Sequence, residues 1–121
     1  MKSIIIIFLL ILTTLYAFAK DPDCAGIDRW PTKMAFVQLK NAGITDNNKV
    51  DFTKTKTIRL ASEKIGDNLY HQIHLIKFTE KSGKIIEMIT INDASNEECS
   101  MGKVEVLLIS KRLEENRNSA Q

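Results

Sequence analysis

The 121-residue sequence has few of the residue types that build catalytic and metal sites. It contains two cysteines and two histidines, and it has no C-x-x-C pair, no Gly-rich phosphate loop and no G-x-S-x-G motif. A structural zinc site takes four ligands at characteristic spacings, and an α/β-hydrolase nucleophile needs its flanking glycines. These absences argue against zinc-dependent, nucleotide-dependent and α/β-hydrolase chemistry, so we expect no metal and no cofactor.

An excess of one charge and a membrane-length apolar run are also missing. The 17 basic and 15 acidic residues give a formal net charge of +2, which predicts neither nucleic acid nor a membrane surface as partner. The longest apolar run covers residues 4–19 and includes two threonines. A helix needs roughly 20 apolar residues to cross a bilayer, so this run is too short for a typical membrane span.

The apolar run instead has the form of a secretory signal peptide. Lys2 precedes it, and Ala17-Phe18-Ala19 ends it with small residues at the cleavage positions. We predict a signal peptide over 1–19, a single α+β domain over 20–112 and a disordered tail over 113–121. The short, Ile-rich leader indicates a bacterial periplasmic protein without a stable membrane anchor after cleavage, and secretion to the outside is the alternative.

Both cysteines, Cys24 and Cys99, lie beyond the predicted cleavage site. In an oxidising compartment, two cysteines of one small domain have a single intramolecular pairing, so we predict a Cys24–Cys99 disulfide. Free or intermolecular thiols are the alternative. A catalytic thiolate is disfavoured because Glu97 and Glu98 next to Cys99 oppose a second negative charge.

One amphipathic helix is predicted from Pro31 to Ala42. Proline suits the first turn of a helix, and Gly43 suits the position just after its end. The apolar residues of this segment follow the spacing of one buried stripe. They are Ala35, Phe36, Leu39 and Ala42.

The rest of the chain alternates as β-structure, with strands predicted over 56–62, 69–79, 84–92 and 103–111. Ser82-Gly83 predicts a two-residue hairpin that places Phe78 opposite Glu87 and Ile76 opposite Ile89. In that register both faces of the hairpin are apolar, which is typical of central strands. One face would carry Ile76, Phe78, Ile89 and Ile91, and the other Ile73, Leu75, Ile86 and Met88.

The predicted fold is therefore α+β: one N-terminal amphipathic helix packed on an antiparallel sheet of about four strands, with a single disulfide. One helix covers one sheet face only in part. We expect the second face to be covered by the N-terminal loop, by the segment around Phe52 or by a partner.

Eight residues are the candidates for contact with a partner, because they combine a basic cluster, an acidic pair, a hairpin tip and the sole tryptophan. They are Trp30, Lys54, Lys56, Arg59, Ser82, Gly83, Glu97 and Glu98. The alternative reading is a solvated surface, an ordinary turn and a tryptophan at the edge of the core. His71 and His74 fall three apart on one strand, so they point to opposite faces and do not form a metal site.

No catalytic constellation is present, so we expect a non-enzymatic exported module that binds another protein in the periplasm or outside the cell. An inhibitor or immunity protein against a cell-wall-directed or toxin enzyme fits this size and composition. One alternative is a small secreted hydrolase or effector that uses carboxylates such as Asp28, Asp51, Glu63 or Glu87. The other is a structural envelope protein without a tight partner.

Overall fold

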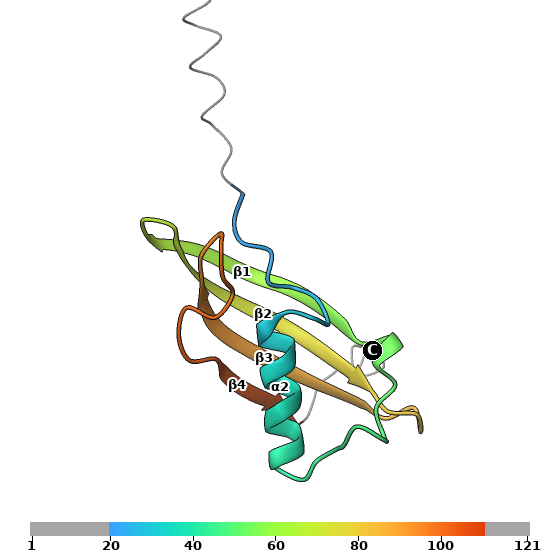
Figure 1. Cartoon of the computed structure of the whole chain (residues 1–121). Helices are drawn as coiled ribbons and strands as arrows, with labels where there is room; N and C mark the ends of the chain where they lie inside the picture. The colour runs from blue at the N-terminus through green and yellow to red at the C-terminus, as the bar shows by residue number, and fades with distance from the viewer. Residues whose placement is uncertain (1–19, 111–121) are drawn as a thin grey trace, which may run out of the picture.

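The computed structural model describes residues 20–110, and it shows one helix packed on a four-stranded antiparallel sheet (Figure 1). The elements are α2 (Trp30–Asn41), the 3₁₀ turn η2 (Phe52–Lys54), β1 (Lys56–Gly66), β2 (Leu69–Thr79), β3 (Ile85–Ala94) and β4 (Glu105–Ile109). Neighbouring strands in the sequence are neighbours in the sheet. The predicted fold class is confirmed, whereas the predicted leader and disordered tail lie outside the described residues.

Helix α2 begins and ends close to the predicted bounds. Its C-terminus is closed by Gly43, at φ 70°, whose N–H donates to Lys40 O at 2.9 Å, while Ile44 N–H donates to Leu39 O at 3.0 Å. This paired arrangement is the Schellman motif, which favours glycine because the position needs a left-handed backbone. Ala42, predicted to be buried, is the exposed C-cap residue instead.

The hairpin between β2 and β3 has a three-residue loop, not the predicted two-residue turn. Glu80 N–H donates to Lys84 O at 2.8 Å, and Gly83 takes the left-handed conformation at φ 95°. Phe78 is therefore opposite Ile86 rather than Glu87. The predicted register is wrong by one residue, because the loop takes up one more residue than expected.

A one-residue change of register moves every β3 side chain to the other face of the sheet. The face toward the helix, called the helix face, carries Ile76, Phe78, Ile86 and Met88. The opposite face, called the open face, carries Ile73, Leu75, Ile89 and Ile91. Both faces are apolar as predicted, but their membership differs.

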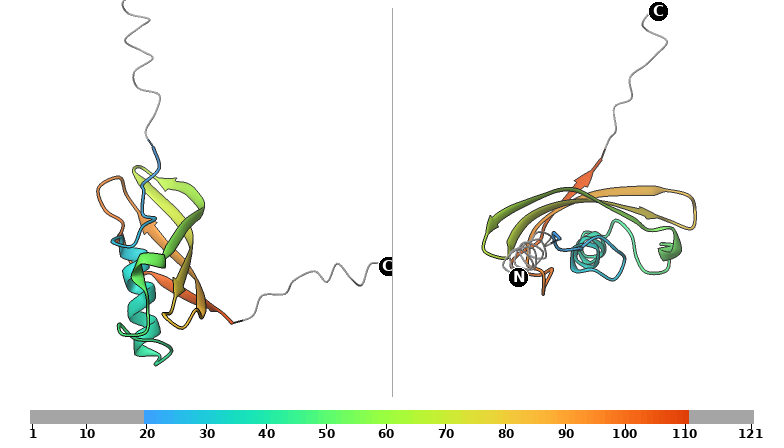
Figure 2. Two further views of the ribbon diagram at one scale, coloured as in Figure 1. Left: turned by 90° about the vertical axis from the view of Figure 1, so that its right-hand side faces the viewer. Right: turned by 90° about the horizontal axis from the view of Figure 1, so that it is seen from above.

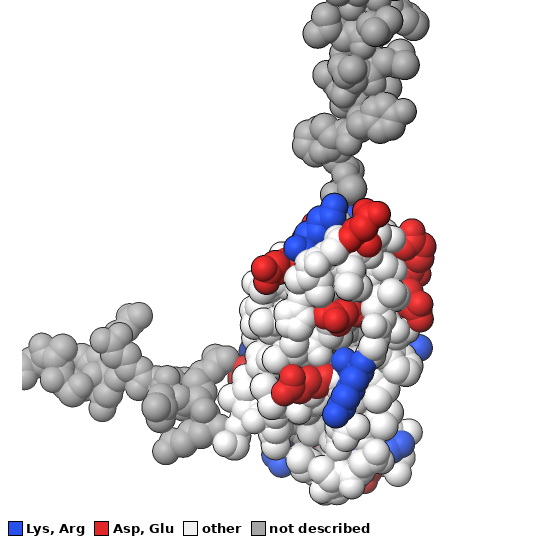
Figure 3. All heavy atoms as spheres, turned by 90° about the vertical axis from the view of Figure 1, so that its left-hand side faces the viewer, with Lys and Arg blue, Asp and Glu red and all other residues white. Residues whose placement is uncertain are grey.

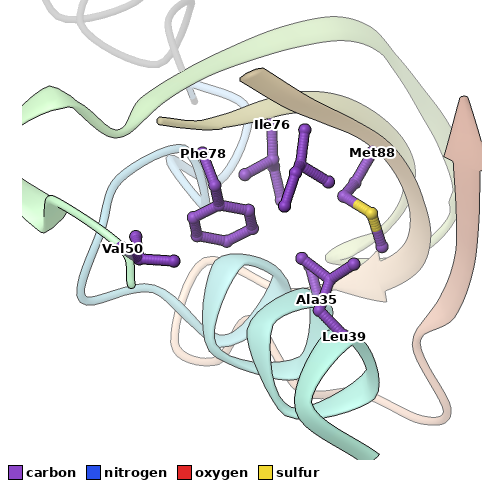
Figure 4. Packing of buried hydrophobic residues seen from close by; sticks show 7 residues of the cluster. Ala35, Leu39, Val50, Ile76, Phe78 and Met88 are labelled. Carbon is purple, nitrogen blue, oxygen red and sulfur yellow. The ribbon is translucent and has the colours of Figure 1, made fainter. Parts of the chain in front are cut away.

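The core lies between α2 and the helix face, beneath the hairpin end of the sheet (Figure 4). Ala35 and Leu39 from the helix pack on Ile76 and Phe78 of the sheet, and Val50 lies at one side of this cluster. Phe36 adds ring contacts to Phe52 at 4.9 Å and to Phe78 at 5.7 Å between centroids. None of the described helices is long and apolar enough to cross a membrane.

Strand β1 runs further than predicted and is irregular. It continues to Gly66, so the turn is formed by Asp67 and Asn68, the latter at φ 51°. The pairing with β2 shifts between Arg59 and Ala61, which interrupts the side-chain alternation of the predicted 56–62 strand at Leu60. At the other edge, β4 is shorter than the predicted 103–111 strand.

The predicted disulfide is confirmed: Cys24 and Cys99 are bonded, with their Cα atoms 5.7 Å apart. It joins the segment before α2 to the loop between β3 and β4. Two sheet amides hold the same segments, since Gln72 Nε2 donates to Pro22 O at 2.9 Å and Asn92 Nδ2 donates to Cys99 O at 3.1 Å. The disulfide therefore closes over one end of the helix face.

Candidate binding face

The open face of the sheet has no cover among the described residues. Figure 2 shows α2, the N-terminal segment and the loop that carries η2 on the concave side of the curved sheet. Pro22 O accepts hydrogen bonds from Gln72 and Arg59, both on the helix face, and the Phe52 ring packs on Phe36. Two of the three expected covers, the N-terminal loop and the Phe52 segment, thus lie on the other face.

The centre of the open face is apolar across the whole width of the sheet. Ile58, Leu75, Ile89 and Leu107 lie opposite one another in register on the four strands. A second row carries Ala61, Ile73 and Ile91. The edge residues Ile58 and Leu107 are 51% and 47% exposed. A contiguous exposed apolar patch of this kind marks an interaction surface more often than an ordinary solvated one.

Rows of charged residues lie on both sides of these apolar rows along the strand direction. At one end, Glu63, His71 and Asp93 are in register, and at the other end Lys56, Lys77 and Glu87 are in register. One further charged residue lies near each end. Glu105 lies opposite Ile91 beside the acidic row, and Lys54 lines a shallow hollow together with Lys56 and Lys77.

In the view from the β4 edge, basic and acidic side chains lie next to one another in the upper and middle parts of the molecule, with broad uncharged areas between them (Figure 3). The upper part contains the 95–104 loop, and the lower part contains the 80–84 hairpin loop (Figure 1). The open face is therefore apolar in its centre and carries charges of both signs toward its ends, since Glu87 lies in the row of Lys56 and Lys77, and Lys103 lines a hollow with Asp93 and Glu105.

The two histidines point to opposite faces, as predicted. His71 lies on the open face, where its Nδ1 is 2.6 Å from Asp93 Oδ1. His74 lies on the helix face and is 1% exposed. Among residues 20–110, no group of three or more His, Cys, Asp or Glu side chains is placed to hold a metal ion.

His74 belongs to a block of buried polar side chains on the helix face. Its cross-strand neighbour is Thr90, and the next pair toward the disulfide is Gln72 and Asn92. Several polar atoms of this block, including both ring nitrogens of His74, have no hydrogen-bond partner among the described residues. Burial lowers the pKa of His74, the positive charge of Arg59 lowers it further, and the Asn92 side chain and Asp23 partly oppose this.

We predict that the free energy of unfolding decreases as the pH falls from about 7.5 to about 5.5. Because the pKa of His74 is lower in the folded state, the unfolded chain binds more protons once the pH falls through its ordinary value near 6.5. The contribution of His74 to the free energy of unfolding is therefore fully present above this pH and decreases below it. One histidine contributes at most about 1.4 kcal/mol over this range, and urea denaturation at both pH values measures the change.

The control separates the two histidines. His74→Gln removes the titrating group and reduces the pH dependence, whereas His71→Gln, on the open face, leaves the contribution of His74 in place. If the decrease between the two pH values is unchanged in His74→Gln, the interpretation is wrong.

The structure disperses the residues predicted to contact a partner. Trp30 starts α2 and is exposed, and Arg59 is on the helix face, where it donates to Pro22 O at 3.1 Å. Glu97 lies in the loop near the disulfide and accepts a hydrogen bond from the Asn68 side chain. This hydrogen bond lowers the pKa of the Glu97 carboxyl group. These side chains therefore do not form one surface.

The remaining predicted contact residues are also separated. Ser82 and Gly83 form the hairpin loop at one end of the sheet, and Glu98 lies in the 95–104 loop at the other end. Lys56 alone among the eight lies on the open face, with Lys54 next to it in the shallow hollow. The apolar residues that make up the open face were not among the predicted contacts.

The carboxylates considered for a hydrolase are also far apart. Glu63 lies opposite His71 and Glu87 lies opposite Lys77, which separates them by about 20 Å along β2. Asp51 caps η2, where its Oδ1 accepts hydrogen bonds from the Thr53 hydroxyl and N–H, and the hydroxyl bond is the main cause of its lowered pKa.

Comparison of the chain with protein-family models, with curated proteins and with solved structures gives no significant match. The functional interpretation therefore depends on the geometry of the open face.

Proposed function

We propose that this chain is an exported, non-enzymatic protein-binding module that docks on its partner through the open face of the sheet. The observation that carries the proposal is the apolar row of Ile58, Leu75, Ile89 and Leu107, which crosses all four strands without cover from the described residues. Burying such a row releases about 25 cal/mol for each Å² of apolar surface removed from water.

The rigidity of the surface supports the same proposal. The two central strands are paired on both sides and packed on α2, and the disulfide ties down the loops at one end. A surface that is already ordered before binding loses little conformational entropy on association. Rigid presentation of an apolar face is what a small inhibitor or immunity protein requires.

The last part of the proposal is the compartment, an oxidising space outside the cytosol. The leader pattern at residues 1–19 and the Cys24–Cys99 disulfide both suit an oxidising space outside the cytosol. We place the protein in the periplasm, with the extracellular space as the alternative. A cell-wall-directed or toxin enzyme is the class of partner that we propose there.

The test is capture of a partner by the oxidised chain 20–121 immobilised in periplasmic extract, with bound proteins identified by mass spectrometry. Ile58→Lys places a charge on the open face without removing core contacts, because Ile58 is exposed. We expect it to weaken capture by about tenfold or more. Val37→Lys is the matched control, because Val37 is 42% exposed on α2, and we expect capture to be unchanged.

Two outcomes would contradict the proposal. Capture that stays unchanged in Ile58→Lys would show that the open face is not the docking surface. A catalytic turnover of the purified chain that one point mutation abolishes would show that the protein is an enzyme.

A further inference from the structure

The helix face contains a compact group of buried polar side chains, here called the polar block. It consists of Gln72, His74, Thr90 and Asn92, each of which is no more than 2% exposed. Gln72 lies directly opposite Asn92, and His74 lies directly opposite Thr90. The four side chains are therefore immediate neighbours on the two central strands.

Five polar atoms of this block have no hydrogen-bond partner among residues 20–110. They are Gln72 Oε1, both ring nitrogens of His74, Thr90 Oγ1 and Asn92 Oδ1. A sixth such atom is Thr32 Oγ1, on the helix side. Thr32 is buried on α2 together with Ala35 and Leu39, one turn before Ala35, so its side chain also points toward the sheet.

The orientation of the two amides follows from their partners. Gln72 Nε2 donates to Pro22 O, and Asn92 Nδ2 donates to Cys99 O. A carbonyl oxygen only accepts hydrogen bonds, so each amide must turn its nitrogen toward that carbonyl. Both amide oxygens are thus left needing a donor, which residues 20–110 do not supply.

His74 and Thr90 need partners of both kinds. Burial lowers the pKa of His74, so the ring is neutral at pH 7 and has one donor and one acceptor nitrogen. The Asn92 side chain lies near enough to raise this pKa, but neither ring nitrogen has a partner with hydrogen-bond geometry among the described residues. A molecule that joins these groups must both donate and accept.

The charge around the block favours a neutral ligand. An anion would meet the acceptor oxygens of Gln72 and Asn92. A cation would meet the positive charge of Arg59, which lies directly opposite His74 on β1. Water is the smallest neutral molecule that both donates and accepts hydrogen bonds.

The cost of leaving these atoms unpaired is too large for a domain of this size. Each buried donor or acceptor without a partner lowers the ratio of folded to unfolded protein by about 5- to 150-fold. Even the smallest factor, applied to five atoms, amounts to about 3,000-fold. The whole ratio for a small domain is about 10³–10⁸, so stable folding requires partners for these atoms.

We infer that the polar block is a binding site for ordered water, which links its unpaired atoms to one another and to Thr32. A buried water makes about three hydrogen bonds, so about two waters supply partners for six atoms. Globular proteins hold about one buried water per 27 residues, so this number is ordinary for the described domain. The site lies on the face opposite the open face, so the inference does not depend on the proposed function.

The N-terminal segment covers this site on the concave side of the sheet (Figure 2). Pro22 O accepts hydrogen bonds from both Gln72 and Arg59, and Cys24 is bonded to Cys99. Arg59 also lines an open hollow with Lys20, Asp21 and Asp23. Solvent therefore reaches the cross-strand neighbour of His74, and water can enter there without opening the apolar core.

The test combines the position of the water with the sign of a stability change. A high-resolution crystal structure of the oxidised chain 20–121 should show ordered water within about 3.2 Å of His74 and of Thr90 Oγ1. Thr90→Val removes the hydroxyl group at nearly constant volume. We expect its Tm to fall by about 4 °C or more, because the hydroxyl is paired through water.

Thr79→Val is the matched control, because Thr79 lies on β2, on the other face, and is partly exposed. We expect its Tm to change by less than about 2 °C. A Tm of Thr90→Val above that of the wild type would overturn the inference, because it would show that the hydroxyl is buried without a partner. A crystal structure in which His74 and Thr90 make hydrogen bonds only to protein atoms would overturn it as well.

Discussion

Loss of the Cys24–Cys99 disulfide is expected to lower the free energy of unfolding by about 2–4 kcal/mol. The bond closes a loop with a sequence separation of 75 residues, for which the chain-entropy relation gives about 4.5 kcal/mol as an upper value. In the folded state it joins segments that Gln72 and Asn92 already hold through Pro22 O and Cys99 O. Those hydrogen bonds keep the native geometry available after reduction, so we expect a weakened fold rather than a lost one.

Two forms of the experiment separate the cross-link from the cavity that mutation creates. Reduced wild type keeps every side-chain atom, whereas Cys24→Ala/Cys99→Ala also removes two sulfur atoms, one of them buried. We expect both to melt more than about 10 °C below the oxidised protein, with the alanine variant slightly lower. Equal melting temperatures of the oxidised and reduced wild type would show that the disulfide does not stabilise the domain.

The disulfide and the helix were predictable because each has a simple cause. Two cysteines beyond a predicted leader have one intramolecular pairing, and Pro31 and Gly43 mark the ends of a helix through their own backbone preferences. The fold class followed from one helix and four alternating strands. These features depend on local chemistry or on the count of one residue type, so a single sequence is sufficient to predict them.

The candidate binding face was only partly predictable. The apolar residues of β2 and β3 predicted that both faces of the sheet are apolar. A partner was one of three predicted covers for the second face. The membership of that face depends on one loop residue, because Gly83 ends a three-residue loop and not a two-residue turn. The irregularity in β1 near Leu60 also has no clear local signal, since it depends on how β1 pairs with β2.

Two of the charged residues predicted as contacts make hydrogen bonds within the chain. Sequence shows that Arg59 and Glu97 are polar, but it does not show that both are used internally, by Pro22 O and by Asn68. Conversely, isoleucines at alternating strand positions are interpreted as ordinary core residues, because the sequence does not show that residues 20–110 cover only one face of the sheet. The position of α2 decides this, and it is a tertiary property.

Phe78→Ala is expected to cost about 3–5 kcal/mol, the largest effect of any single substitution proposed for this chain. Phe78 is 1% exposed, contacts the Phe36 ring and lies at the centre of the core beneath α2. Its removal leaves a cavity that Ile76 and Val50 cannot fill without moving the strand or the preceding loop. Urea denaturation measures the loss, and Ile58→Ala on the exposed open face is the control, with an expected cost below about 0.5 kcal/mol.

A double-mutant cycle with Phe78→Ala also tests the strand register on which the open face depends. In the structure Phe78 is directly opposite Ile86, and both are buried on the helix face. Phe78→Ala and Ile86→Ala should therefore be non-additive by about 0.5–3 kcal/mol, because the two substitutions enlarge one cavity. Glu87→Ala lies on the other face and should add to Phe78→Ala within about 0.5 kcal/mol. Strong coupling of Phe78 to Glu87 instead of Ile86 would restore the two-residue hairpin register, and it would move Ile89 and Ile91 from the open face to the core.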